Sequence, residues 1–354
     1  MDALSGKRLS WLDVGKGLGI LLVIFAHTEL PHEIKKYIYT FHVPLFFFLS
    51  GYLFSSDNAP FKTFFTKKFK GLIVPYLWFS LITYLWLVLK FIVGLTGDAK
   101  VDILYAPILG TFYAIRDSAG SIHNGTLWFV ACLVCVELLF FLFIKMSREN
   151  VKTLSLMLFV SSIIGYTYSI YIAKPLPWSI DTALSAVVFY GIGYLLKEYQ
   201  VVLEKLMNFK YVVVLFLINM VAGSLNSMVD IFYNKLGNYI LFYTAAISGI
   251  LLVVVLIKAL TTSFALEYIG RNTFILLAFH QSVIFDVIRQ VVKRSNSLST
   301  FFENNHLIMG IFYLATTLVI SIPIIFIINK YLPFLVGKKK HKKLNDQSSN
   351  IGAA

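Results

Sequence analysis

The stretch WLDVGKGLGILLVIFAH (Trp11–His27) reads as a membrane span that carries three polar side chains. Charges and an imidazole inside an apolar span are costly, so they usually face a protein interior or a watery cavity and mark function. At 100° per residue, Lys16 falls within about 20° and Asp13 within about 40° of His27, so the three share one helix face. Lys16 and His27 lie roughly 16 Å apart along the axis, too far for a hydrogen bond. This spacing suits a tunnel with a charged inner end and a proton-handling outer end.

The composition is that of an integral membrane protein. Of the 354 residues, 58% are hydrophobic and 14% charged, and the mean hydropathy is +0.77. Windows of about 19 residues predict ten helices, near 11–29, 37–55, 71–93, 125–145, 153–173, 178–196, 210–227, 238–260, 273–291 and 307–331. We therefore expect one all-α, polytopic membrane domain over residues 1–335. A basic and then polar cytoplasmic tail, expected to be disordered, follows at 336–354.

The distribution of Lys and Arg predicts the orientation. With the amino terminus inside, about twice as many Lys and Arg lie in cytoplasmic as in outer segments, which is the usual bias. An even number of helices then places both termini in the cytoplasm. The net charge of +13 requires no nucleic-acid partner, and the Lys338–Lys343 run can rest on anionic lipid headgroups. Asp13 and Lys16 interrupt the apolar run, which disfavours a cleavable signal peptide.

Three further residues in the predicted spans can carry chemistry. His42 enters the second span from outside, at a depth similar to that of His27, and Glu137 and His280 lie near mid-depth in the fourth and ninth spans. A neutral imidazole can take a proton from a hydroxyl, and a carboxylate can hold its tautomer. The bland alternative for each histidine is a hydrogen bond across helices. We take His27 as the candidate catalytic residue and His42 and Glu137 as its candidate helpers.

A basic and aromatic segment, FKTFFTKKFKGLIVPY (Phe61–Tyr76), lies on the predicted cytoplasmic side. Its lysines could bind phosphates and its aromatic rings could stack on a base, although ordinary positive-inside charge gives the same pattern. Gly15, Gly17 and Gly19 either free space beside the first helix for a long thin ligand or permit close helix packing.

Two other motifs have ordinary interpretations. Cys132 and Cys135 form a C-x-x-C in an apolar helical setting, which favours packing over redox chemistry. Asn124-Gly-Thr126 matches a glycosylation sequon, which matters only in a eukaryotic secretory host.

These motifs resemble those of the acyltransferase 3 family, in the branch similar to fucose 4-O-acetylases and bacterial polysaccharide O-acetyltransferases. Lys16 and His27, preceded by Asp13, match the basic-x10-His pattern, with lysine where arginine is common. FHVPLFFFLSGY (Phe41–Tyr52) matches the second-helix signature. The remaining landmarks are KKFK (Lys67–Lys70) followed by Pro75-Tyr76, Leu127-Trp128-Phe129, and IGRNT (Ile269–Thr273) with His280. The resemblance covers nearly the whole chain.

The resemblance implies transfer of an acyl group, usually acetyl, from cytoplasmic acyl-CoA to a sugar hydroxyl at or beyond the outer face of a bacterial cell membrane. It implies catalysis by His27, and we group the other candidate residues around it by role. These are His42, Glu137 and Asp13 as catalytic helpers, Lys16, Lys67, Lys68, Lys70 and Tyr76 at the CoA site, and Trp128 and His280 at the acceptor. Lysine lacks the bidentate fork of arginine, which loosens phosphate recognition. A ternary complex and an acyl-histidine intermediate both remain open.

The expected partners are acetyl-CoA as co-substrate, a sugar or polysaccharide acceptor and membrane lipids, with a homo-oligomer as an open alternative. We expect no metal and no nucleic acid. Two other functions compete with acyl transfer. The first is a transporter or flippase for a glycolipid or polysaccharide precursor, with the intramembrane charges as a proton relay. Such proteins often show internal repeats, and none stands out here. The second is a scaffold of a polysaccharide synthesis complex, which would not need the alignment of Lys16 and His27.

Overall fold

The computed structural model describes residues 9–55, 60–96, 102–115, 123–199, 201, 205–206, 208–259 and 263–338. Within these ranges the regular elements are helices, together with one isolated bridge between Asp230 and Lys235. The first half contains α1 (Ser10–Ala26), α2 (His32–Tyr39), α3 (His42–Tyr52), α4 (Phe61–Lys68), η1 (Phe69–Ile73), α5 (Val74–Ile92), α6 (Asp102–Tyr113), η2 (Gly125–Leu127), α7 (Trp128–Ser147) and α8 (Val151–Tyr171). The second half contains η3 (Pro177–Ser179), α9 (Ile180–Glu198), α11 (Phe209–Leu225), α12 (Tyr239–Ala259), α13 (Phe264–Arg271), α14 (Thr273–Phe279), η4 (His280–Ile284), α15 (Phe285–Lys293), α16 (Asn296–Glu303), α17 (His306–Tyr331) and η5 (Pro333–Val336).

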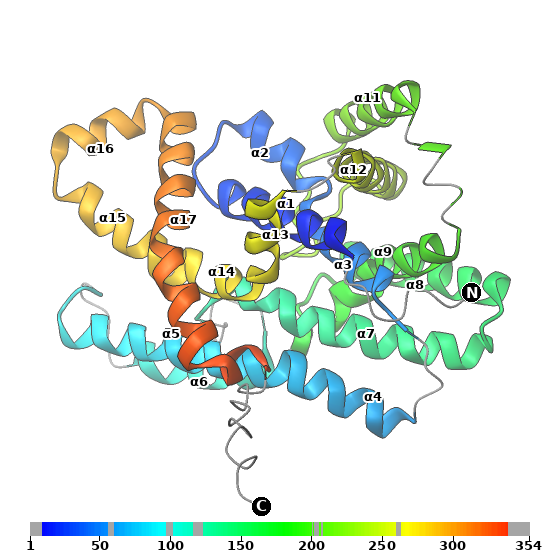
Figure 1. Cartoon of the computed structure of the whole chain (residues 1–354), viewed down its shortest axis with the longest axis horizontal. Coiled ribbons are helices and arrows are strands. Elements are labelled where there is room, and N and C mark those ends of the chain that lie inside the picture. The colour runs from blue at the N-terminus through cyan, green and yellow to red at the C-terminus, as the bar shows by residue number, and fades with distance from the viewer. Residues whose placement is uncertain are drawn as a thin grey trace, which may run out of the picture.

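Helices α1 and α3 form the centre of the molecule, and glycines set how closely their neighbours approach (Figure 1). A Cβ on Gly17 would strike the Leu266 carbonyl of α13, and one on Gly270 of α13 would strike the Asp13 carbonyl of α1. Gly51 of α3 and Gly193 of α9 are crowded in the same reciprocal way, against each other's helix backbone. Small residues permit such backbone contact between membrane helices. Of the two interpretations of the α1 glycines, close helix packing is therefore the one that this structure shows.

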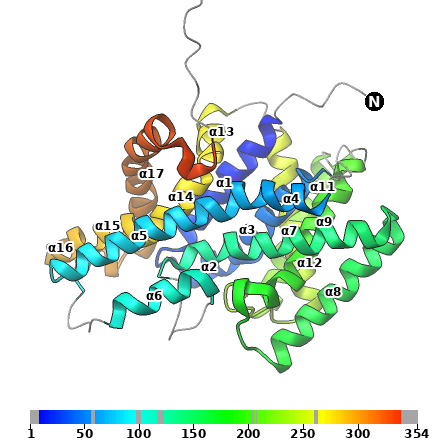
Figure 2. The same cartoon turned by 90° about the horizontal axis from the view of Figure 1, so that it is seen from below.

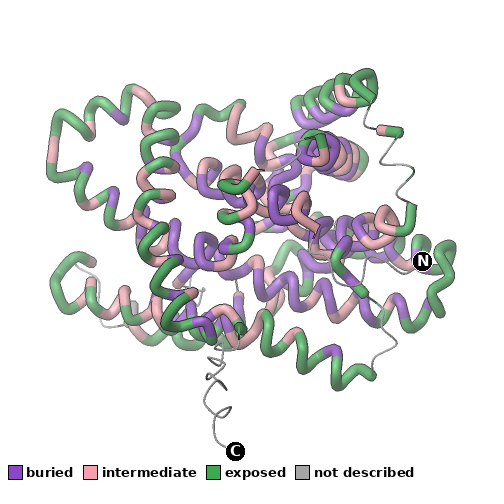
Figure 3. The backbone as a smooth tube through the Cα atoms, viewed as in Figure 1, coloured by how far each residue is buried: buried purple, intermediate pink, exposed green. Residues whose placement is uncertain are grey.

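The outer helices expose apolar side chains, as expected of a protein in lipid. Buried residues gather around α1 and α3, whereas the outward faces of α8, α11 and α17 are exposed (Figure 3). Those exposed faces carry large hydrophobic side chains, among them Phe159, Phe216 and Val319. In the described part of the chain, seven helices are long and apolar enough to cross a membrane. The predicted all-α, polytopic membrane fold is confirmed, while the number of ten spans and the sides of the termini stay predictions.

The structure corrects the second predicted span, which is not one helix over 37–55. It is divided into α2 and α3 at Phe41, whose φ of −141° is not helical. Pro44 explains the break, because proline has no N–H to donate to the Thr40 carbonyl and its ring clashes with that position. The first helix also ends earlier than predicted, at Ala26 instead of residue 29, so His27 caps it.

The segments that the charge bias assigns to the cytoplasm meet at one end of the bundle. The Ser10 hydroxyl donates to Glu267 (2.6 Å), which joins the start of α1 to α13. Asn329 near the end of α17 donates to Asn272 (2.7 Å), just after α13. In the second view α4, η1 and α5 form one long rod (Figure 2). The predicted tail at 336–354 falls mostly outside the described residues.

The crowding at Gly270 predicts a large effect of a single methyl group. Gly270→Ala should lower the stability of the detergent-purified protein by about 1–3 kcal/mol, because the added Cβ overlaps the α1 backbone. Gly71→Ala is the matched control, since no atom lies within 4 Å of an added Cβ there. Thermal unfolding followed by tryptophan fluorescence measures both variants. Equal melting temperatures for the two would contradict the proposed α1–α13 contact.

Candidate active site

His27 lies just past the last turn of α1 and contacts His280 at the start of η4. Its Nδ1 is 2.8 Å from Nε2 of His280, and the two rings are nearly parallel, with an interplanar angle of 10°. His280 is fully buried, whereas His27 is half-buried. The sequence predicted both residues as parts of a site but not their contact, because they are far apart in the chain.

His280 is positioned by an irregular turn in its own span. The helix changes at His280 from the α form of α14 to the π form of η4, and such changes are frequent at functional sites. The His280 Nδ1 lies 2.9 Å from the Leu276 carbonyl, which also accepts the His280 backbone N–H.

Two buried side chains before α7 bind the same turn. The Thr126 hydroxyl donates to the Leu277 carbonyl (2.6 Å), and the Asn124 amide donates to the Ala278 carbonyl (2.7 Å). Both side chains belong to the segment that reads as a glycosylation sequon. Sequence reasoning missed this structural role, since only the fold brings the segment to α14.

These hydrogen bonds determine which ring nitrogens carry protons. A carbonyl oxygen only accepts, so Nδ1 of His280 is the protonated nitrogen, and its Nε2 is bare in the neutral ring. An imidazolium buried without a counter-charge is costly, which favours the neutral ring. His27 therefore donates from Nδ1 to His280, and its own Nε2 keeps a lone pair. His42 follows the same rule, because its Nδ1 lies 2.8 Å from the Ile38 carbonyl.

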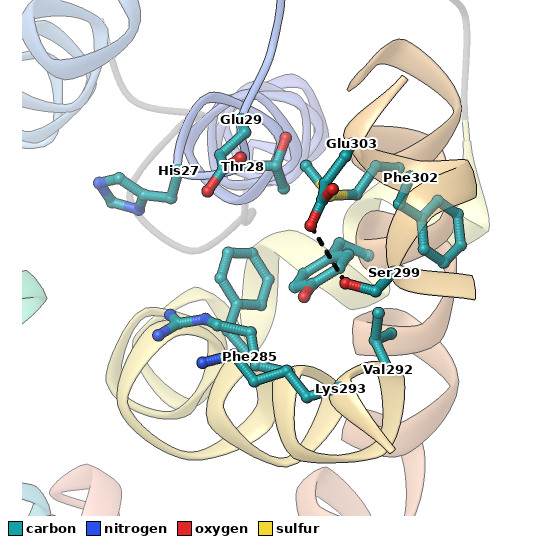
Figure 4. Close-up of a pocket in the computed structure, with 12 residues that line it drawn as sticks. His27, Thr28, Glu29, Phe285, Val292, Lys293, Ser299, Phe302 and Glu303 are labelled. Carbon is teal, nitrogen blue, oxygen red and sulfur yellow. Dashed lines mark hydrogen bonds between the residues drawn. The ribbon is translucent and has the colours of Figure 1, made fainter. Parts of the chain in front are cut away.

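His27 lies between two cavities. The inner cavity, of about 60 Å³, is mostly apolar and is lined by His27, His42, Phe46 and Trp128, among others. The outer cavity, of about 420 Å³, is walled by the residues after α1 and by α15, α16 and α17. Figure 4 shows Thr28 and Glu29 on one side of the outer cavity and the ring of His27 turned away from its middle. His27 thus lines both cavities.

Glu137 lies among residues of the predicted cytoplasmic side, apart from the histidines. It accepts a hydrogen bond from Lys68 (2.7 Å), and the Tyr190 hydroxyl lies 3.5 Å away. Lys67 and Lys70 are exposed, and Lys70 lies in the π-helix η1. Of the three lysines that the sequence predicts at the CoA site in this segment, Lys67 and Lys70 are therefore open to a ligand. A ligand could bind Lys68 only by breaking its ion pair with the buried Glu137.

The remaining candidates are Asp13 and Lys16, which lie near the start of α1 and far from His27, and Tyr76 of α5. Asp13 pairs with Arg271 of α13 (3.4 Å), and fourteen residues of helix rise separate it from His27 by roughly 21 Å. Lys16 is half-buried in the second turn of α1. Tyr76 is 1% exposed and donates to the Thr111 carbonyl (2.6 Å), so its ring presents no open face for stacking.

The sequence matches a known family model. This model, described as an acyltransferase domain, matches residues 9–328, a range that includes all the candidate residues. No curated protein and no solved structure matches the chain. The acyltransferase resemblance noted from the motifs is thus confirmed, whereas the likeness to fucose 4-O-acetylases stays a prediction.

The hydrogen-bond chain predicts one tautomer for His27. In ¹⁵N-histidine-labelled protein at neutral pH, Nδ1 of His27 should give a protonated signal and Nε2 a bare one, as seen by solid-state NMR. Replacement of His280 by alanine removes the acceptor, so both tautomers of His27 should then appear. A His27 ring protonated at Nε2 in the unaltered protein would contradict the chain of bonds.

Proposed function

The chain belongs to the acyltransferase family whose model it matches, and we propose that it is a membrane O-acyltransferase of the bacterial cell membrane. The donor is cytoplasmic acetyl-CoA or a similar short acyl-CoA. The acceptor is a hydroxyl of a cell-surface polysaccharide or of its lipid-linked sugar precursor. Membership of this family favours a transferase over a flippase or a scaffold.

One observation carries the proposal. The hydrogen bond from His27 to His280 leaves a lone pair on Nε2 of His27, the residue that lines both cavities. A general base needs a bare nitrogen within reach of the hydroxyl that it deprotonates. Because the two cavities share His27 in their linings, donor and acceptor can be bound at the same time. This favours direct transfer in a ternary complex over an acyl-histidine intermediate.

The reaction then needs one proton shuttle. The His27 Nε2 takes the proton of the acceptor hydroxyl while the oxygen of that hydroxyl attacks the thioester carbonyl carbon. The C–S bond breaks, the ester forms, and the CoA thiolate takes the proton back from His27. His280 acts as a positioning residue throughout, since it holds the His27 ring by its Nδ1–H. His42 lines the inner cavity with a bare Nε2 and can orient the thioester through a bound water.

The placement of the cations supports a cytoplasmic donor. Lys67 and Lys70 are exposed on the predicted cytoplasmic side, where CoA phosphates can bind them. Lys16 lies between that end and His27, roughly 16 Å from the latter along α1, a span that an extended pantetheine arm can bridge. The small apolar inner cavity suits a short acyl group such as acetyl. Asp13 supports this path indirectly, because its pair with Arg271 holds α13 on α1.

Removal of the base should stop the reaction. His27→Ala should lower acetyl transfer at least about a thousandfold, and His280→Ala about a hundredfold, because the second change only frees the tautomer of His27. Radiolabelled acetyl-CoA supplied to sealed inside-out vesicles measures the transfer, with the protein level checked by immunoblot.

His306→Ala is the control, since His306 is exposed and lines neither cavity. It should keep full activity. Full activity in a well-inserted His27→Ala protein would refute the proposed base, and transfer from acetyl-CoA outside right-side-out vesicles would refute the cytoplasmic donor.

Neutralising the two exposed lysines should weaken donor binding. The double change Lys67→Gln and Lys70→Gln should raise the KM for acetyl-CoA about tenfold or more and change kcat little, since the phosphates are remote from the reacting atoms. Lys152→Gln, an exposed change at the start of α8 on the same predicted side, should leave KM unchanged. Lys68 is unsuitable for this test because its loss leaves Glu137 buried without its partner. An unaltered KM in the double variant would mean that these two lysines do not bind the donor and only help to set the orientation of the protein in the membrane.

A further inference from the structure

The outer cavity carries two cations on one wall. Arg289 and Lys293 lie one turn apart on α15, both exposed, and both line the cavity. Within the part of the chain that the structure describes, neither forms an ion pair. Like charges at this spacing repel each other on a helix. The pair is therefore unfavourable for the helix by itself, unless an anion binds between its members.

The charge bias of the chain makes these cations more notable. Positive residues are disfavoured on the outer side of a membrane protein, and this segment lies on the predicted outer side. The acidic residue of the same helix, Asp286, is already paired with another cation, Lys90 of α5 (2.7 Å). The cavity also holds two carboxylates, yet Arg289 and Lys293 pair with neither of them.

The remaining walls offer groups that suit a sugar. Thr28 and Glu29 face α15 across the cavity, and Ser299 and Glu303 of α16 close a third side (Figure 4). Glu303 accepts a hydrogen bond from Ser299 (3.2 Å), while Glu29 is exposed and can accept one from a ligand hydroxyl. Aromatic side chains, including Phe302 and Tyr313, add apolar surface. The volume of about 420 Å³ lies within the usual range for ligand sites.

We propose that the outer cavity binds an acidic saccharide, whose carboxylate or phosphate lies against Arg289 and Lys293 and whose reacting hydroxyl lies at His27. This inference rests on the proposed function and narrows its acceptor to an anionic sugar. Arg289 can hold a carboxylate or phosphate bidentately, and Lys293 supplies a point charge. Glu29 accepts a hydrogen bond from another hydroxyl and disfavours a second anionic group on that side.

Ligand-dependent stabilisation of the full chain in neutral detergent tests the proposal without any use of acetyl-CoA. Melting temperatures against ligand concentration give a Kd for each probe. The probes are two matched pairs: tetragalacturonate with its carboxyl-reduced form, and glucose 6-phosphate with glucose. In at least one pair the acidic member should bind at least about tenfold more tightly than the neutral one. Lys293→Gln and Arg289→Gln should each remove most of that difference and leave neutral binding unchanged.

Arg294→Gln is the matched control, because it removes the same charge from the next residue along, which does not line the cavity. It should leave every Kd within about twofold. Equal binding of acidic and neutral members in both pairs overturns the proposal, as does an equal effect of Arg294→Gln and Lys293→Gln. Short-chain phosphatidylglycerol is tested in the same way, as an anionic lipid. If this lipid stabilises the protein, neither acidic sugar does, and Lys293→Gln removes the effect, the cavity binds a lipid headgroup and the proposal is overturned. Failure of the proposed acyltransferase function would be seen in a separate experiment, in which membranes with the unaltered protein transfer no radiolabelled acetyl group.

Discussion

The Leu276 carbonyl determines the proton positions at the site. It accepts from Nδ1 of His280, which makes Nε2 of His280 an acceptor for His27 and leaves Nε2 of His27 bare. In many hydrolases a carboxylate holds the imidazole in this way and also stabilises the imidazolium. A carbonyl carries no net charge, so here the tautomer is held while the imidazolium gains less stabilisation. Such a base would return its proton readily, which suits the proposed reaction, in which the leaving thiolate needs that proton at once.

The apolar surroundings explain why the polar residues occur in partnered sets. Lys68 and Glu137 join the α4 end to α7, and Arg271 and Asp13 join α13 to α1. Loss of the cation beside a buried carboxylate leaves that charge without its compensation, at a cost far larger than the stabilisation that the pair provides. Glu137 is the stronger case, because its Oε2 has no hydrogen-bond partner among the described residues and depends on Lys68 for compensation. These pairs hold together helices that are distant in sequence.

The sequence predicted the helices well because hydropathy and length are local properties. It identified His27, His42 and His280 as candidate site residues for the same reason, since an imidazole in an apolar run is visible without a fold. It could not predict that His280 and not Glu137 contacts His27, because the contact depends on how the first and ninth spans pack. It also could not show that Asn124 and Thr126 bind the turn before His280. The sequence alone could have predicted the helix break at Phe41, since Pro44 is a local signal for such a break.

The helix is interrupted twice at the predicted outer end, and the two interruptions have a common consequence. The first helix ends at Ala26 and the second predicted span breaks at Phe41, so non-helical backbone lies on either side of α2. Irregular backbone at membrane depth is tolerated only where protein covers it or where it lines a cavity. Thr28 and Glu29, in the first interruption, line the outer cavity beside His27. Had α1 continued as a regular helix to residue 29, these side chains would follow the helix surface. The early end of α1 therefore opens space beside His27, where the proposed acceptor would bind.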